Sequence, residues 1–251
     1  MIGIYGGRMG RVPLYREVKE KFIQALASGE WPPGAKIPIE RELAARYGVG
    51  ISTIRAAASE LEAAGILSRR QGKGTFVSEH TRQSTFYRFF NLVTNGGVRE
   101  MPLRTFVSMQ RRRPSGEERE WLELSRYGKR DEVFRLRSTF SLRGRTVGVS
   151  DATVPAALFP RMRKFNVADG TIPLYGLYQA NHGVNVISVA ADLSADTAPA
   201  DVAKLLAIRA GSPVMRIGRR AYTYGDVPVE LRVTWVNTKD CKFHLEQGST
   251  V

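Results

Sequence analysis

Cysteine and histidine are scarce in this chain of 251 residues, which contains one cysteine, Cys241, and three histidines. A single cysteine excludes an intramolecular disulfide framework and any metal site built from several thiolates. His80, His182 and His244 lie far apart in the sequence, so they indicate no metal cluster. We therefore expect no metal and no cofactor, and a reducing cytoplasm as the location.

Long apolar runs are also missing. No uninterrupted stretch of about 18 apolar residues, the length that spans a bilayer, occurs in the chain. The N-terminal MIGIYGGRMGR has no apolar centre and no small-residue cleavage site, unlike a secretory signal. Hydrophobic residues still make up 43% and charged residues 25%, which excludes wholesale disorder. We expect a cytoplasmic protein of one large or two modest domains with no membrane partner.

Acidic residues are few relative to basic ones. The chain has 24 Asp and Glu against 38 Lys and Arg, a net charge of +14 and a pI near 10.3. An excess of this size favours a polyanionic partner, usually nucleic acid. Both the first 80 residues and the remainder carry net positive charge, so charge does not locate the binding surface.

The first part of the chain reads as three short helices. Apolar residues four positions apart, from Leu14 to Leu26, predict an amphipathic helix that ends at Ser28-Gly29. A second helix is predicted over residues 40–47, and a third over residues 52–61 after a glycine-containing turn. Two short helices joined by a tight turn make a helix-turn-helix, whose second helix can enter the DNA major groove.

A basic hairpin follows these helices. Residues 66–70 and 75–77 have the composition of two short strands, and Gln71-Gly72-Lys73-Gly74 forms the turn between them. Glycines let a backbone approach a phosphate or the minor groove closely, and the arginines and lysine supply positive charge. The hairpin is therefore predicted to be a wing.

Residues 13–77 resemble the N-terminal winged helix-turn-helix domain of the GntR superfamily of bacterial transcription regulators. The motifs that carry the resemblance are Pro13-Leu14-Tyr15, Gly29-Glu30-Trp31, Pro33-Gly34, Glu40-Arg41-Glu42-Leu43-Ala44, Gly48-Val49, Thr53-Ile54-Arg55 and the run from Arg69 to Val77. The resemblance implies double-stranded DNA as partner. It implies these contact residues: Arg41, Ser52, Thr53, Arg55, Arg70, Gln71, Gly72, Lys73 and Gly74.

Two positions depart from the family pattern. Ile39 stands where serine is common, so the second helix loses a side-chain N-cap. Gly50-Ile51 stands where serine-arginine is common, so a base-reading arginine is missing. We expect a half-site different from that of the commonest members, with Ser52 carrying more of the readout.

The rest of the chain is mostly strands in hairpins, with helices between them. We expect a DNA-binding domain at 1–78 with a tail at 1–11, a linker at 79–84 and an antiparallel α+β domain at 85–251. The predicted strands are Thr105–Arg113, Val133–Leu142, Thr146–Val154, Val184–Ala191, Pro213–Tyr224 and Val227–Asn237.

This second part resembles the effector domain of the HutC subfamily, called UTRA, whose fold is similar to chorismate lyase. The supporting stretches are residues 133–137, 153–160, 205–206, 211–214 and 227–230. The resemblance implies a domain that binds a small metabolite and thereby changes the DNA affinity of a homodimer.

Members that bind phosphorylated sugars tend to carry two arginines where this chain has Ser138 and Phe140. Without that arginine fork a phosphate loses its strongest partners, so we expect an effector other than a sugar phosphate, such as a carboxylate or aromatic metabolite. Arg88, Arg104 or Arg137 would be its counter-ion, and a shifted alignment would place Arg135 and Arg137 in the site instead.

The candidate effector-binding residues are Arg88, Phe89, Phe90, Arg104, Arg137, Ser138, Phe140, Ser150, Glu230 and Trp235. Core packing is the alternative for the phenylalanines, and an ordinary strand position is the alternative for Ser150, Glu230 and Trp235. The basic stretch from Arg82 to Arg113 suits either DNA or an effector.

Together these features predict a metabolite-responsive repressor that binds a pseudo-palindromic operator as a homodimer. An architectural DNA binder without a ligand is the alternative. An enzyme is the least favoured, because the chain has no GxSxG, HExxH, P-loop or GxGxxG motif.

Overall fold

The structure, a computed structural model, describes residues 13–79, 91–128, 131–163, 168, 170 and 172–245. Contacts divide the chain into two compact units, Met1–Ser78 and Glu79–Val251. No helix in the described parts is long and apolar enough to cross a membrane.

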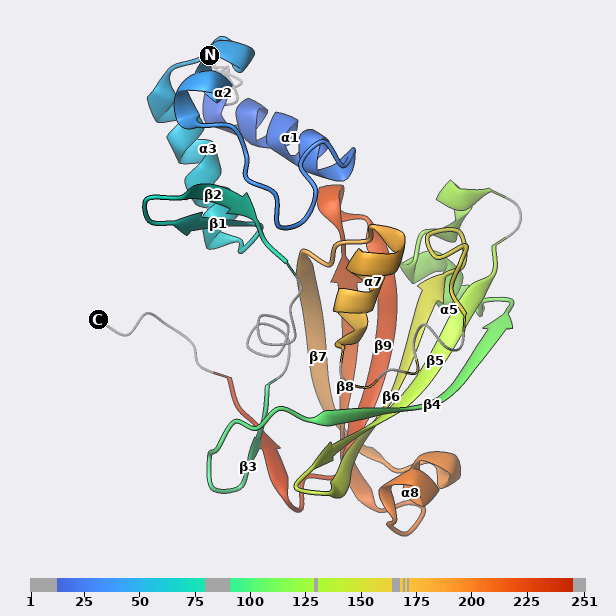
Figure 1. The fold of residues 1–251 in the computed structure, drawn as a ribbon. Helices are drawn as coiled ribbons and strands as arrows, with labels where there is room; N and C mark the ends of the chain where they lie inside the picture. Colours follow the sequence, from blue (N-terminus) through green and yellow to red (C-terminus); the bar gives the residue numbers. More distant parts are fainter. Residues whose placement is uncertain are drawn as a thin grey trace, which may run out of the picture. The chain divides into compact units, whose positions relative to one another are not determined.

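The first unit is a three-helix domain with a hairpin (Figure 1). It contains α1 (Leu14–Ala27), α2 (Glu40–Tyr47), α3 (Ile51–Ala63), β1 (Leu67–Arg70) and β2 (Gly74–Val77). The apolar face predicted for α1 is buried at Val18, Phe22 and Leu26, and Ile54 and Leu61 of α3 are fully buried. Burial of these faces holds α3 against α1 and leaves its polar side exposed.

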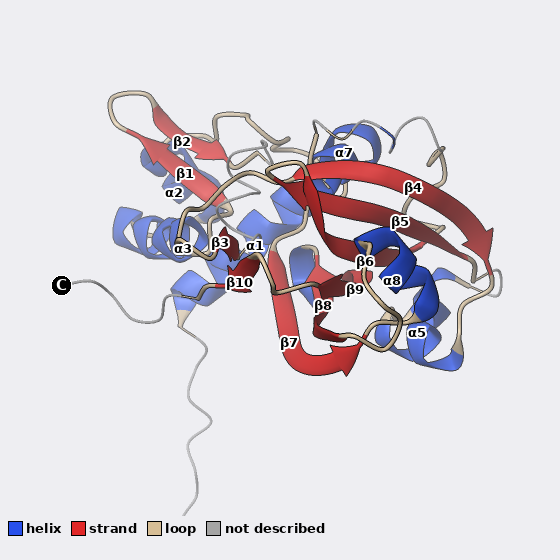
Figure 2. Ribbon diagram, turned by 90° about the horizontal axis from the view of Figure 1, so that it is seen from below, coloured by secondary structure: helices blue, strands red, loops and turns tan. Residues whose placement is uncertain are grey.

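The second unit is built on a six-stranded antiparallel sheet in the order β4-β5-β6-β9-β8-β7 (Figures 1 and 2). Its strands are β4 (Leu103–Arg112), β5 (Val133–Leu142), β6 (Arg145–Pro155), β7 (Ser188–Thr197), β8 (Pro213–Tyr222) and β9 (Pro228–Val236). A separate small sheet pairs β3 (Leu92–Thr94) with β10 (Cys241–Phe243).

Helices cover both faces of the large sheet. α7 (Leu174–His182) packs on one face through Tyr175 and Tyr178, which join a core with strand residues such as Leu136 and Val154. We call this the α7 face. The opposite face, here the α5 face, is covered by α5 (Gly116–Trp121), the 3-10 helix η1 (Leu124–Tyr127) and α8 (Ala200–Leu206). A further 3-10 turn, η2 (Tyr224–Asp226), lies between β8 and β9.

The predicted class is confirmed: a winged helical domain followed by an antiparallel α+β domain. The strand predicted over Val184–Ala191 is placed wrongly, because β7 runs over Ser188–Thr197. Val184 and Val186 are buried in the α7 core outside any strand, so their apolar character reflects tertiary packing. β3 and β10 were not predicted, since three residues carry too little pattern.

Candidate DNA-binding surface and effector site

The polar side of α3 presents the predicted recognition residues. Ser52 and Arg55 are exposed and Thr53 is half-buried, while Ile54 between them faces the core. Arg41 is exposed near the start of α2. A cavity of about 400 Å³ lies between α2, α3 and the hairpin and is lined by Arg41, Arg55 and Arg69, among others. The structure therefore gathers Arg41 and Arg55 on one concave surface with a hairpin arginine absent from the predicted set.

Glu40 holds two of these guanidinium groups in place. Arg55 Nη2 donates to Glu40 Oε2 at 2.7 Å, and Arg69 Nη2 donates to Glu40 Oε1 at 3.0 Å. The hydrogen bond from Arg55 lowers the pKa of Glu40 against the opposing effect of burial, and Arg69 adds to the fall. The Arg55 side chain nevertheless stays 60% exposed, so it is positioned but accessible. Glu40 and Arg69 were missed as site residues, because their contact with Arg55 joins segments 15 and 29 residues apart.

The hairpin between β1 and β2 has the geometry of a wing. Gln71, Gly72 and Lys73 are exposed at its tip, and the backbone of Gly72 has φ of +70°. Gly74 has φ of +113°, and an added Cβ there would lie 2.5 Å from Lys36 Cε. The Arg70 guanidinium stacks over Phe76 at 4.4 Å from the ring centre. Stacking pre-orders a cation beside a glycine tip that the DNA backbone can approach.

The start of α2 agrees with the predicted loss of a serine cap. Ile39 provides no side-chain cap, and only its backbone N–H is bound, by Glu42 Oε2 at 3.1 Å. Glu42 thus satisfies one of the free donors near the helix start.

The predicted effector residues do not line one site, because neighbouring strand residues point to opposite faces. Ser138, Phe140, Ser150, Glu230 and Arg104 lie on the α7 face, in register with Leu136 and Ala152 of its core. Arg137 and Trp235 lie on the α5 face. Placing Arg137 beside Ser138 in one site is therefore an error. Arg88, Phe89 and Phe90 fall outside the described residues.

Small hydroxyl groups form a row across the middle of the α7 face. Ser138 lies opposite Ser150, and Ser150 lies opposite Thr234 on the next strand. Ser138 and Ser150 are buried. Arg104 is also buried at 6% exposure, and its Nη1 lies 3.5 Å from Ser138 Oγ. The row offers hydrogen-bonding groups in a buried setting, which is how small-molecule sites orient a ligand.

Glu230 is fully buried beside this row and accepts four hydrogen bonds. Arg232 donates through Nε and Nη2 at 2.8 and 2.7 Å, Tyr178 through its hydroxyl at 2.8 Å and Tyr175 at 3.1 Å. Burial raises the pKa of Tyr175 to about 12, and Glu230 adds to the rise. Burial and Glu230 likewise raise the pKa of Tyr178 well above its usual value. These four bonds occupy the carboxylate, so Glu230 orients Arg232 and its acceptor sites are already filled.

Arg219 stands directly opposite Arg232 on the neighbouring strand. Two positive charges in directly opposed positions repel each other. The carboxylate of Glu230 offsets part of this repulsion, because it is hydrogen-bonded to Arg232. Arg219 Nε is buried and donates to no group in the described part of the chain. Sequence reasoning missed both arginines. The i, i+2 spacing of Glu230 and Arg232 on a strand, which puts both on one face, was the available signal.

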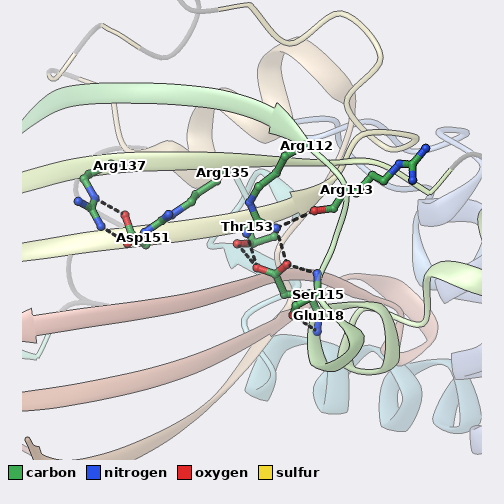
Figure 3. A network of polar contacts seen from close by, with 8 residues as sticks. All are labelled: Arg112, Arg113, Ser115, Glu118, Arg135, Arg137, Asp151 and Thr153. Carbon is green, nitrogen blue, oxygen red and sulfur yellow. Dashed lines mark hydrogen bonds and ion pairs between the residues drawn. The ribbon is translucent and has the colours of Figure 1, made fainter. Parts of the chain in front are cut away.

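Arg137 has its charge matched already on the α5 face (Figure 3). It donates to both oxygens of Asp151 at 2.7 Å and to Asp201 at 2.5 Å, and these bonds raise its pKa. Arg135 also donates to Asp151, at 2.5 Å. Burial alone would raise the pKa of Asp151, but the two arginines outweigh it and lower that pKa. The alternative alignment, which puts Arg135 and Arg137 in the effector site, is therefore not favoured, because both guanidinium groups are already paired with carboxylates.

A second ion pair on this face anchors α5 to the sheet (Figure 3). Glu118 accepts from Arg112 on β4 at 2.6 and 2.7 Å and from Thr153 on β6 at 3.1 Å. The same carboxylate closes a capping box, since Ser115 N donates to it at 2.9 Å and Glu118 N donates to Ser115 Oγ at 3.1 Å. The network positions a helix and accounts for the partial burial of Glu118.

A cavity of about 380 Å³ adjoins this network and contains Trp235 in its lining. Trp235 Nε1 is buried with no hydrogen-bond partner among the residues that the structure describes. The arginines Arg112, Arg135 and Arg220 in the same lining are each paired with a carboxylate. Within the described ranges no group of three or more His, Cys, Asp or Glu side chains is placed to hold a metal ion.

Comparison with known proteins matches both units. Residues 14–77 match the family described as bacterial regulatory proteins, gntR family, and residues 102–242 match the UTRA domain. The chain is 32% identical to a histidine utilization repressor of Pseudomonas putida, over 88% of this chain and 86% of that protein. It is 28% identical to a probable fructoselysine utilization operon transcriptional repressor of Escherichia coli, over 87% and 88%.

Solved structures show the same fold. The ligand-binding domain of a putative GntR-family transcriptional regulator from Bordetella bronchiseptica has a TM-score of 0.59 and 25% identity, covering 64% of this chain and 99% of that one. PhnF from Mycobacterium smegmatis has a TM-score of 0.53 and 20% identity, covering 93% and 100%.

Proposed function

Because this chain belongs to the GntR family of bacterial regulatory proteins and carries a UTRA domain, we propose that it represses transcription as a homodimer that a small metabolite releases from its operator. Family membership makes it a DNA-binding transcription regulator with a small-molecule effector, and no enzyme. Two relatives that align with most of this chain are named as repressors, which supports repression rather than activation by this protein.

The exposed cationic surface of the first unit is the observation that carries this proposal. Arg55 on α3 is held by Glu40 yet remains accessible, and Arg69 and Arg70 continue the positive surface onto the wing. Arginine addresses both phosphates and the guanine edge in bidentate fashion. Two such heads related by a two-fold axis would bind the halves of a pseudo-palindrome.

The effector is proposed to bind on the α7 face beside the Ser138–Ser150–Thr234 row. Arg104, Arg219 and Arg232 bring three positive charges to this face, where Glu230 is bonded to Arg232. Ser138 and Phe140 cannot supply the arginine fork that grips a phosphate dianion. A small carboxylate metabolite fits this arrangement better than a sugar phosphate, and no cofactor is required.

A footprint on the DNA upstream of the chain's own gene tests the proposal, run at fixed salt with and without a metabolite panel. The panel contains histidine, which the Pseudomonas relative's name suggests, together with carboxylate metabolites and sugar phosphates. A protected inverted repeat that a carboxylate releases is the expected result. Protection that every metabolite leaves unchanged would instead favour an architectural DNA binder.

Arg55→Ala should abolish specific binding, because it removes the accessible cation at the centre of α3. Arg46→Ala is a matched control, since Arg46 is also exposed and ion-paired, in its case with Glu30, but lies on α2 and outside α3. Circular dichroism should show both variants folded. Normal operator affinity of Arg55→Ala would contradict the placement of the recognition helix.

A further inference from the structure

The strand β7 is an unprotected sheet edge. In the part of the chain that the structure describes it pairs with β8 alone, in continuous register from Ser188 to Thr197 (Figure 2). Most of its residues are exposed on both faces, including Leu193 at 46%. An edge of this length leaves a row of backbone N–H and C=O groups open to another strand.

The other edge of the same sheet carries the usual protection. β4 has a break in register between Phe106 and Ser108, and the positively charged Arg111 and Arg112 lie along it. Bulges and cationic side chains are the devices that keep sheet edges from pairing. β7 has no bulge, no proline, no lysine and no arginine, and its sequence SVAADLSADT is dominated by small residues. This difference between the β4 and β7 edges indicates that another strand covers β7 when the protein functions.

We propose that a second copy of this chain covers it, with the two β7 strands pairing antiparallel about Leu193. The assignment rests on the homodimer of the proposed function and names the surface that forms it. A two-fold axis makes one patch serve both copies, which is the commonest symmetry of soluble oligomers. The two six-stranded sheets then join into one continuous sheet.

Symmetry and charge select the register. Directly opposed residues must share a face of the sheet, so the axis must place one residue opposite its own copy. An axis at Asp192 would oppose that carboxylate to itself, and an axis at Ser194 would oppose Asp192 to Asp196. Axes at Ala191, Leu193 and Ala195 oppose no two like charges. Of these three, the axis at Leu193 pairs the longest part of β7, residues 189–197 of both strands, and it opposes Leu193 to Leu193.

The same register places every aspartate of β7 in line with an arginine of the other copy. Within one copy Arg220 lies opposite Ala190 and pairs with Asp192 at 3.3 Å. Arg216 lies opposite Ser194 and is 4.0 Å from Asp196. Across the axis Ala190 meets Asp196 and Ser194 meets Asp192. In each row an arginine, a small residue and an aspartate of the other copy follow one another. Each arginine of an intrachain ion pair therefore also faces an aspartate of the other copy across a small residue. This charge complementarity is what favours a second copy over an unrelated partner.

Lysine substitution tests the interface. Leu193→Lys opposes two ammonium groups on the axis, and sedimentation equilibrium should show the dimer dissociation constant raised at least about tenfold. Val107→Lys is the matched control, since Val107 is 39% exposed on the β4 edge, and it should leave the constant unchanged. Far-UV circular dichroism confirms that each variant is folded. Equal constants for the two variants would overturn the assignment.

Cysteine substitution tests the register independently. Opposed residues of antiparallel strands have Cα atoms about 4.5–5.5 Å apart, within disulfide range. Leu193→Cys should therefore form a covalent dimer on mild oxidation. Ala191→Cys should not, because residue 191 faces residue 195 of the other copy. The wild-type chain is the control, and it should not cross-link because Cys241 is buried.

The outcomes separate this assignment from the proposed function. A wild-type chain that sediments as a monomer would overturn both the homodimer and the β7 interface. A wild-type dimer with no cross-link from Leu193→Cys and no effect of Leu193→Lys would overturn the β7 interface alone. Operator footprinting by the wild-type chain remains the separate test of DNA binding.

Discussion

Replacing Glu230 with glutamine should destabilise the second unit strongly. The carboxylate is fully buried and joins β9 to α7 through Arg232, Tyr175 and Tyr178. Glutamine keeps the shape and one acceptor oxygen, but it removes the negative charge. Arg232, whose side chain is only 11% exposed, then loses the carboxylate that neutralises it.

The size of the effect follows from that burial. Removing one partner of a buried ion pair costs about 3–5 kcal/mol, because the remaining charge stays desolvated. The retained amide oxygen puts Glu230→Gln near the lower end, at about 3 kcal/mol. In a domain of this size each kcal/mol lowers the melting temperature by roughly 2–4 °C. The expected fall is therefore roughly 6–12 °C.

Urea and thermal unfolding measure this change, with Trp121 and Trp235 as fluorescent reporters in the second unit. Glu132→Gln is the control, because Glu132 and its partner Arg111 are 41% and 59% exposed. An exposed pair contributes below about 1 kcal/mol. If Glu230→Gln lowered stability no more than this control, the interpretation of the network as a buried, charge-dependent link would be refuted.

Two further measurements test the electrostatics. Asp151 has a lowered pKa, so its contribution to folding should be complete above about pH 5 and lost as the pH falls below about 4, through the folded-state pKa. The stability gap between wild type and Asp151→Asn should thus close on acidification, whereas a gap independent of pH would contradict the assignment. Asp240→Asn, at an exposed pair with Arg145, is its control. Operator affinity should also fall by about 10³-fold between 50 and 200 mM salt if a dimer makes roughly six phosphate contacts, while a flat salt response would exclude phosphate neutralisation.

The DNA-binding unit could be predicted from the sequence because its determinants are local. The four-residue spacing from Leu14 to Leu26, the turn after Gly48 and the glycine tip of the wing each act within a few residues. Local periodicity and turn chemistry are enough to set such elements. The ion pairs of Glu40 with Arg55 and Arg69 were not visible, because they form only after α3 and the wing pack together.

The effector domain shows the opposite balance. Alternation along β5 separates Arg137 from Ser138, but only the strand order shows what each then meets: Asp151 and Asp201 for the first, Ser150 for the second. Glu230 was identified from the sequence, yet its partners Tyr175 and Tyr178 lie more than 50 residues away on α7.

By itself the sequence determined the winged helix-turn-helix, the α+β class and the excess of positive charge, since all three depend on residue order or composition. Only the tertiary structure decided which polar side chains share a face, which charges are already paired and which sheet edge stays open. Those properties depend on strand order and helix packing, which join residues that no local pattern connects.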